Sequence, residues 1–135
     1  LALERLTIIL ACERITDEEV VKLREACTAF ERVVKSKKSE MTEIVEKDEE
    51  FHDIIYNATR NDRLIQVLSN LREQMYRYRL EYIKDAKGRQ RLVSEHKEIV
   101  GSLERKDLES AKRVMHVHLE NQEETVKKNI QAVKK

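Results

Sequence analysis

The sequence lacks the residues that interrupt helices. Its 135 residues contain no proline, no tryptophan and only two glycines. Turn-rich β folds depend on glycine and proline, so this composition excludes most of them and favours long helices. The sequence also has no run of 18 apolar residues and no recognisable signal peptide, and we therefore expect no membrane association.

Cysteine is scarce as well, and neither sign of charge dominates. Cys12 and Cys27 match no zinc or redox spacing, which predicts a reduced, cytoplasmic protein without a disulfide framework. The 27 basic and 26 acidic residues leave a net charge of +1, which gives no general attraction to nucleic-acid phosphates. With 40% hydrophobic residues, the chain is expected to fold around one core as a single domain.

Apolar residues recur with helical periodicity in six segments. Thr16 and Glu19 have the spacing of a capping box, Asn61 is a predicted N-cap, and Gly88 is predicted to mark a break between helices. The predicted helices cover residues 3–14, 16–36, 39–58, 62–83, 89–104 and 107–130. Because the connections are short, we predict an all-α fold, an antiparallel bundle of six to seven helices.

Polar residues interrupt the apolar faces of three of these helices. Asp48 and His52 lie four residues apart on one face, and His96 and His118 lie on the apolar faces of two further helices. Burial of such groups is costly unless they are paired or bind a metal. Three imidazoles and one carboxylate suit a divalent transition metal, so we predict one metal ion per chain at Asp48, His52, His96 and His118.

Two other interpretations of these residues remain open. A histidine on an apolar face is often a neutral, hydrogen-bonded core residue, so the four groups could form a structural network without a ligand. Glu49 and His52 form the Glu-x-x-His unit that di-iron bundles use twice, but it occurs once here and gives little support for two metals. His116 lies on a mixed, charged face and is predicted to be a surface residue.

Two arginines border the apolar face of the predicted helix over residues 62–83. Arg72 and Arg79 share this face with Leu68, Met75 and Tyr82. Guanidinium groups bind carboxylates through two parallel hydrogen bonds, so Arg79 or Arg72 could hold an anionic effector. Alternatively, either arginine could extend to water or pair across a dimer interface.

Four segments in the same order resemble the FCD domain, the C-terminal ligand-binding domain of FadR-subfamily regulators in the GntR superfamily. Residues 48–64 resemble its D-x-x-F-H…A-x-x-N-x-x-L pattern, and residues 95–99 resemble E-H-x-x-I. Residues 107–119 resemble D-x-x-x-A-x-x-x-M-x-x-H-L, and residues 3–16 resemble the first helix of that domain. The resemblance covers nearly the whole chain.

The resemblance implies a function as well as a helical bundle. In the metal-binding branch of the family, one aspartate and three histidines hold a divalent metal, often zinc or nickel. These positions correspond to Asp48, His52, His96 and His118. The metal helps to bind a small organic-acid effector, and effector binding changes how a homodimer presents two winged helix-turn-helix domains to DNA. FadR itself lacks these ligands and binds acyl-CoA, so the intact set indicates the metal-binding branch.

The winged helix-turn-helix domain of the family is absent from these 135 residues, which begin with Leu1 rather than methionine. We therefore expect residues 1–135 to be the ligand-binding and dimerisation domain of a longer regulator that contacts DNA only through the missing domain. The leading hypothesis is a metal-dependent, effector-sensing domain and not an enzyme. The alternative is a mononuclear metalloenzyme of the hydrolase type on a helical bundle, because open metal positions can activate water.

Overall fold

The computed structural model describes the backbone of residues 2–134 and the side chains of residues 3–130. Seven helices account for nearly all of this part of the chain, which confirms the predicted all-α fold. They are α1 (Ala2–Arg14), α2 (Asp17–Lys35), α3 (Met41–Ala58), α4 (Asp62–Asn70), α5 (Arg72–Lys84), α6 (Ala86–Glu104) and α7 (Leu108–Lys134). Of these helices, none combines the length and apolar character that a membrane span requires.

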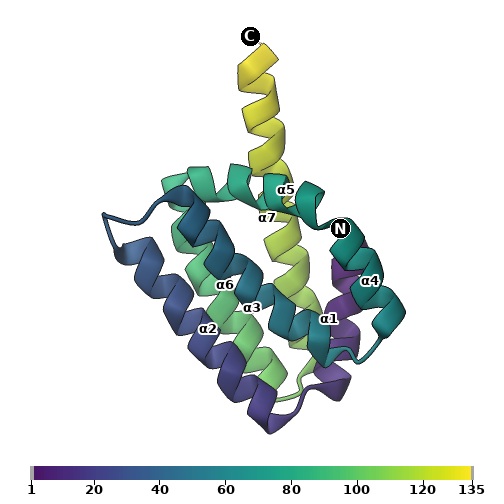
Figure 1. Cartoon of the computed structure of the whole chain (residues 1–135). Coiled ribbons are helices and arrows are strands. Elements are labelled where there is room, and N and C mark those ends of the chain that lie inside the picture. The colour runs from purple at the N-terminus through teal and green to yellow at the C-terminus, as the bar shows by residue number, and fades with distance from the viewer. Residues whose placement is uncertain (1, 135) are drawn as a thin grey trace.

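Five helices form a closed ring around the core, and α5 lies across one end of it (Figure 1). In the ring, α3 packs on α1 and α2, α6 packs on α2 and α7, and α7 packs on α1. Helix α5 contacts α3, α6 and α7, so it covers the interior from above in this view. The C-terminal turns of α7 extend past α5 and away from the bundle.

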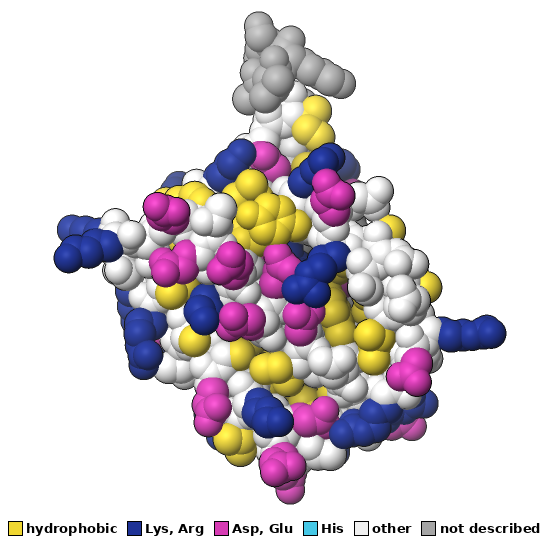
Figure 2. All heavy atoms as spheres, viewed as in Figure 1, with side chains coloured by type: hydrophobic (Ala, Val, Ile, Leu, Met, Phe, Trp, Pro, Cys, Tyr) yellow, Lys and Arg dark blue, Asp and Glu magenta, His cyan; other side chains and the backbone are white. Residues whose placement is uncertain are grey.

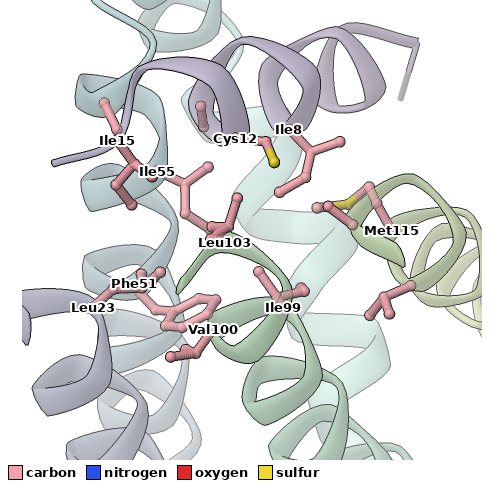
Figure 3. Packing of buried hydrophobic residues seen from close by; sticks show 14 of the residues in the cluster. Ile8, Cys12, Ile15, Leu23, Phe51, Ile55, Ile99, Val100, Leu103 and Met115 are labelled. Carbon is pink, nitrogen blue, oxygen red and sulfur yellow. The ribbon is translucent and has the colours of Figure 1, made fainter. Parts of the chain in front are cut away.

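Two apolar clusters fill the ring. The larger includes Ile8, Leu23, Phe51 and Leu103, contributed by four different helices (Figure 3). The smaller lies towards α5 and includes Phe30, Val45, Tyr82 and Leu92. Since burial of an aliphatic or aromatic side chain contributes about 1.5–3 kcal/mol each, these clusters supply most of the driving force for folding.

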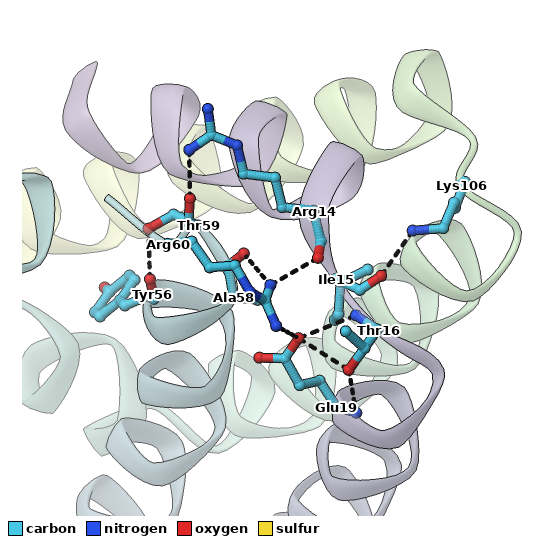
Figure 4. A network of polar contacts seen from close by, with 9 residues as sticks. All are labelled: Arg14, Ile15, Thr16, Glu19, Tyr56, Ala58, Thr59, Arg60 and Lys106. Carbon is cyan, nitrogen blue, oxygen red and sulfur yellow. Dashed lines mark hydrogen bonds and ion pairs between the residues drawn. The ribbon is translucent and has the colours of Figure 1, made fainter. Parts of the chain in front are cut away.

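Polar contacts link the short loops between helices at the end of the bundle opposite α5 (Figure 4). The predicted capping box is confirmed, since the Thr16 hydroxyl accepts a hydrogen bond from the Glu19 amide and the Glu19 carboxylate accepts one from the Thr16 amide. Glu19 also pairs with Arg60 at 2.8 Å, which joins the start of α2 to the end of α3. Lys106, after α6, donates to the Ile15 carbonyl at 2.7 Å.

Two predicted helix boundaries are wrong. The segment predicted as one helix over residues 62–83 is divided at Leu71, where ψ is near zero and the amide bonds back to the Val67 and Leu68 carbonyls. No glycine or proline marks this turn, so the break between the two helices could not be predicted from the sequence. The break predicted at Gly88 lies instead at Asp85, whose side chain caps α6.

Gly88 lies inside α6 because another helix approaches it closely. An ideal Cβ at this position would lie 2.5 Å from the backbone oxygen of Tyr82, too short for any real contact. An ideal Cβ at Gly101, also in α6, would meet only the end of the flexible Arg105 side chain, at 3.1 Å. Close packing of the backbone therefore requires glycine at position 88, whereas a small side chain could be accommodated at position 101.

These two glycines predict opposite effects of alanine. Gly88→Ala should destabilise the protein by about 1–3 kcal/mol, because α5 and α6 must move apart. Gly101→Ala should be neutral or stabilising by up to about 1 kcal/mol, since alanine is the better helix former. Urea unfolding followed by circular dichroism measures both, and equal effects of the two substitutions would contradict the close approach at Gly88.

Candidate metal centre

The predicted donor residues Asp48, His52 and His96 come together inside the ring. The side chain of Asp48 is 0% exposed, and its Oδ1 lies 2.9 Å from Nε2 of His96 and 3.3 Å from Nε2 of His52. One donor atom from each of the three residues lies within 4.8 Å of the other two. This separation is short enough for a single metal ion to contact all three.

The donor atoms at this site lack hydrogen-bond partners. Although they lie near each other, no contact with hydrogen-bonding geometry reaches the two Asp48 oxygens or the Nε2 atoms of His52, His96 and His118. Buried polar groups in native proteins almost always have a partner, because an unpaired one costs about 1–3 kcal/mol. A single metal ion could satisfy the donor atoms of Asp48, His52 and His96 at once, so the residues present fit a metal.

His118 lies beside this group of three. Its ring is nearly parallel to that of His52, at an interplanar angle of 24° and 6.0 Å between centroids. Its Nδ1 pairs with the Glu95 carboxylate, which also accepts hydrogen bonds from Tyr82 and Asn121 at 3.2 and 3.0 Å. A proton on Nδ1 leaves the lone pair of Nε2 free, which is the arrangement that metal-binding histidines use.

Burial sets the charge states that a metal requires. His96 lies between Phe51, whose ring stacks on it at 3.9 Å between centroids, and Phe30 at 4.5 Å. This burial lowers the pKa of His96 to about 4, against the opposing effect of Asp48, so its imidazole is neutral at pH 7. Burial alone would raise the pKa of Asp48, but His52 and His96 hold it well below its ordinary value. The site thus offers a carboxylate and a neutral imidazole.

The two predicted effector arginines lie in different environments. Arg79 is buried, with Nε 3.7 Å from the Asp48 carboxylate and Nη2 3.5 Å from Glu4, and it donates a hydrogen bond to the Tyr56 hydroxyl. The Arg72 side chain is 57% exposed and pairs with Glu49 at 2.9 Å and with Asp53 at 3.3 Å. The three residues that could share one ion include Asp48 and not Glu49, whose carboxylate pairs with Arg72.

A cavity of about 200 Å³ between α3, α4 and α5 connects the two arginines. Its lining includes both Arg72 and Arg79 together with Tyr56, Leu68 and Met75.

Acidic and basic side chains are mixed on the face shown in Figure 2, and no histidine is visible there. His116 is exposed and pairs with Glu120 at 3.0 Å, which confirms its prediction as a surface residue.

Sequence reasoning missed the residues that surround the donor set. Glu4 and Tyr56 hold Arg79, and Glu95 and Tyr82 orient His118. Glu95 directly precedes His96, and its position in the E-H-x-x-I segment is the one signal that could have indicated it. Glu4 and Tyr56 carry no such signal, because they reach Arg79 from separate helices.

The environments of the two arginines predict different effects on stability. Arg79→Met should destabilise the metal-free protein by about 3–5 kcal/mol, because Asp48 and Glu4 lose their buried counter-charge. Arg72→Met should cost less than about 1 kcal/mol, since the Arg72 guanidinium is more than half exposed and water screens its ion pairs. Chemical unfolding at pH 7 compares them, and similar losses would contradict the buried role of Arg79.

Comparisons with known proteins identify the family. The FCD domain profile matches residues 1–121. The chain is similar to the Uxu operon transcriptional regulator of Escherichia coli (strain K12), with 32% identity over 116 residues, or 82% of this chain and 44% of that protein. It is also similar to the uncharacterized HTH-type transcriptional regulator YdhC of Bacillus subtilis (strain 168), with 25% identity over 126 residues, or 93% of this chain and 55% of that protein.

The chain spans about half the length of these two relatives. Both are named as transcriptional regulators and neither as an enzyme, in agreement with the expectation of a regulatory domain. The profile match includes the Asp48, His52, His96 and His118 positions and all four segments on which the resemblance rests. The chain belongs to the FCD domain family.

Proposed function

We propose that this chain is a metal-dependent, effector-sensing domain of a transcriptional regulator. The observation that carries the proposal is the set of buried donor atoms at Asp48, His52 and His96, which lie close together without hydrogen-bond partners. His118, whose buried Nε2 also lacks a partner, is the proposed fourth ligand. Imidazole nitrogen and carboxylate oxygen suit divalent transition metals, and zinc or nickel is the expected ion. Three protein ligands would leave the fourth position of a tetrahedral zinc open, and a metal that expands to five-coordination would keep an open position beside all four.

The effector in this proposal is a small organic acid. A bound metal would supply an open position for one carboxylate oxygen. Arg79 would pair with the acid, because its guanidinium already lies beside the Asp48 carboxylate and lines the cavity of about 200 Å³. Arg72 lies at the exposed side of the same cavity and would attract the anion there.

Effector binding would affect the rest of the regulator by changing a contact between α5 and α1. Arg79 pairs with Glu4 on α1, so an acid that draws the guanidinium towards itself weakens the contact with the first turns of the chain. A difference in affinity between two arrangements is sufficient to shift their populations. We propose that the arrangements are those of a cytoplasmic homodimer and that DNA is contacted by a domain outside these residues, since one relative is named as HTH-type.

Metal loading tests the proposal directly. The purified protein should take up about one zinc or nickel ion per chain, and its melting temperature should rise by about 10 °C at a metal concentration 100 times the Kd. His118→Ala should abolish most of this rise, while His116→Ala, the matched change on the surface of α7, should keep it. Elemental analysis and thermal melts measure both quantities, and absence of metal after loading would reject the proposed mechanism.

The Glu95 carboxylate, which pairs with Nδ1 of His118, predicts that its substitution weakens metal binding without abolishing it. Glu95→Gln should weaken metal binding about 10–100-fold, because the amide no longer holds His118 as a strong, correctly oriented ligand. Glu98→Gln, on the exposed face of α6, is the matched control and should leave the affinity unchanged. Competition with a chromophoric chelator gives both constants, and an unchanged Kd for the Glu95 variant would exclude His118 as a ligand.

A further inference from the structure

Helix α4 forms one wall of the cavity that joins the two arginines. Ile65, Leu68 and Ser69 of α4 line this cavity, opposite residues of α3. The cavity also reaches Arg79, whose Nε lies 3.7 Å from the Asp48 carboxylate. The side chain of Asp48 is 0% exposed, so an ion or a small acid can reach the candidate metal centre only when part of the bundle moves.

Little apolar burial holds α4 in place. It is nine residues long and lies at the periphery of the bundle (Figure 1). Its buried residues are Leu64 and Leu68, which belong to a small cluster with Tyr56, separate from the two clusters that fill the ring. Few buried apolar contacts are typical of segments that open locally while the rest of the domain stays folded. We therefore expect α4 to open more readily than the helices of the ring.

The backbone at the two ends of α4 is suited to such a movement. Arg60, which precedes α4, has a φ of 50°, in the left-handed region that residues other than glycine rarely adopt. Leu71, which follows α4, has a ψ of 2° and separates it from α5. Hinges are usually a few residues at the ends of helices or strands that absorb changes of φ and ψ. Arg60 and Leu71 occupy such positions.

Ion pairs fasten both ends of α4 to other helices. Arg60 pairs with Glu19 at 2.8 Å, which ties the N-terminal end to α2. Arg72, directly after Leu71, pairs with Glu49 and Asp53 of α3. Arg72 and both of its partners line the cavity, so their separation would open the cavity at this end. Water screens these pairs because the Arg72 side chain is 57% exposed, and they can therefore break at little cost.

We propose that α4 is a lid over the route to the candidate metal centre and that the ion pairs of Arg72 with Glu49 and Asp53 are its latch. This inference rests on the proposed function. When the pairs break and the backbone bends at both ends of α4, the helix moves outward and the cavity opens to solvent as far as Arg79. Closure of the lid then excludes bulk water from whatever has entered.

Hydrogen exchange of the metal-free chain tests the lid without any ligand. The amides of residues 66–70 should exchange at least about 100-fold faster than those in the central turns of α3 and α6, because only local opening is needed. Arg72→Met should raise the exchange rates in α4 about two- to fivefold. Arg77→Met is the matched control and should leave them unchanged, since its partner Glu73 lies within α5.

The rate of zinc release to an excess of chelator tests whether α4 controls access. Leu64→Ala removes one of the two buried side chains of α4, so it should raise both hydrogen exchange in α4 and zinc release by the same factor, at least about tenfold. Val20→Ala on α2, at 7% exposure against 6% for Leu64, is the matched control. It should change neither rate by more than about twofold, because the larger cluster that contains Val20 stays intact when the lid opens. Arg72→Met, with a two- to fivefold increase in both rates, keeps the test valid if the Leu64 variant folds poorly.

The outcomes separate the lid from the function on which it rests. Equal protection of α4 and α3 would overturn the lid and leave metal loading intact, and unchanged exchange in the Arg72 variant would overturn the latch. Faster exchange in α4 without faster zinc release would overturn control of access, and would favour the cavity of about 180 Å³ between α1, α5 and α7, which also reaches Arg79. If the chain takes up no zinc, the proposed function fails and the role of α4 in access fails with it.

Discussion

The buried carboxylate of Asp48 is the constraint on which the interior of this bundle depends. A charge that is fully removed from water is stable only when donors or counter-charges surround it. His52 lies one turn away on α3, His96 comes from α6, and Arg79 comes from α5. Three helices must therefore converge on one point. The turn at Leu71 contributes to this convergence because it lets α5 cross the end of the ring.

The surroundings of the histidines set their chemistry as much as the histidines themselves. Phe51 and Phe30 remove His96 from water and keep its imidazole neutral. Glu95 orients His118, and Tyr82 holds Glu95 from the far end of α5. These contacts extend the candidate site well beyond four donor residues, into the two apolar clusters that fill the ring.

Arg79 is the point at which the candidate site meets the rest of the fold. It lies beside Asp48, pairs with Glu4 on α1, donates to Tyr56 and lines two cavities. In the proposed function, this position lets one guanidinium respond to an acid at the metal and alter a contact with α1. Arg72 has the same side chain, but its guanidinium is more than half exposed, so burial distinguishes the two.

The sequence by itself determined the helical fold, the capping box at Thr16 and the presence of four polar residues on apolar helix faces, because these features follow from local periodicity and residue chemistry. The four residues are Asp48, His52, His96 and His118. Only the tertiary structure decided that α4 and α5 are separate helices, that Gly88 faces the backbone of another helix, and that Arg79 is buried while Arg72 is exposed. These features depend on how distant helices pack, and residues brought together from α1, α5 and α7 leave no pattern along the chain that predicts their contact.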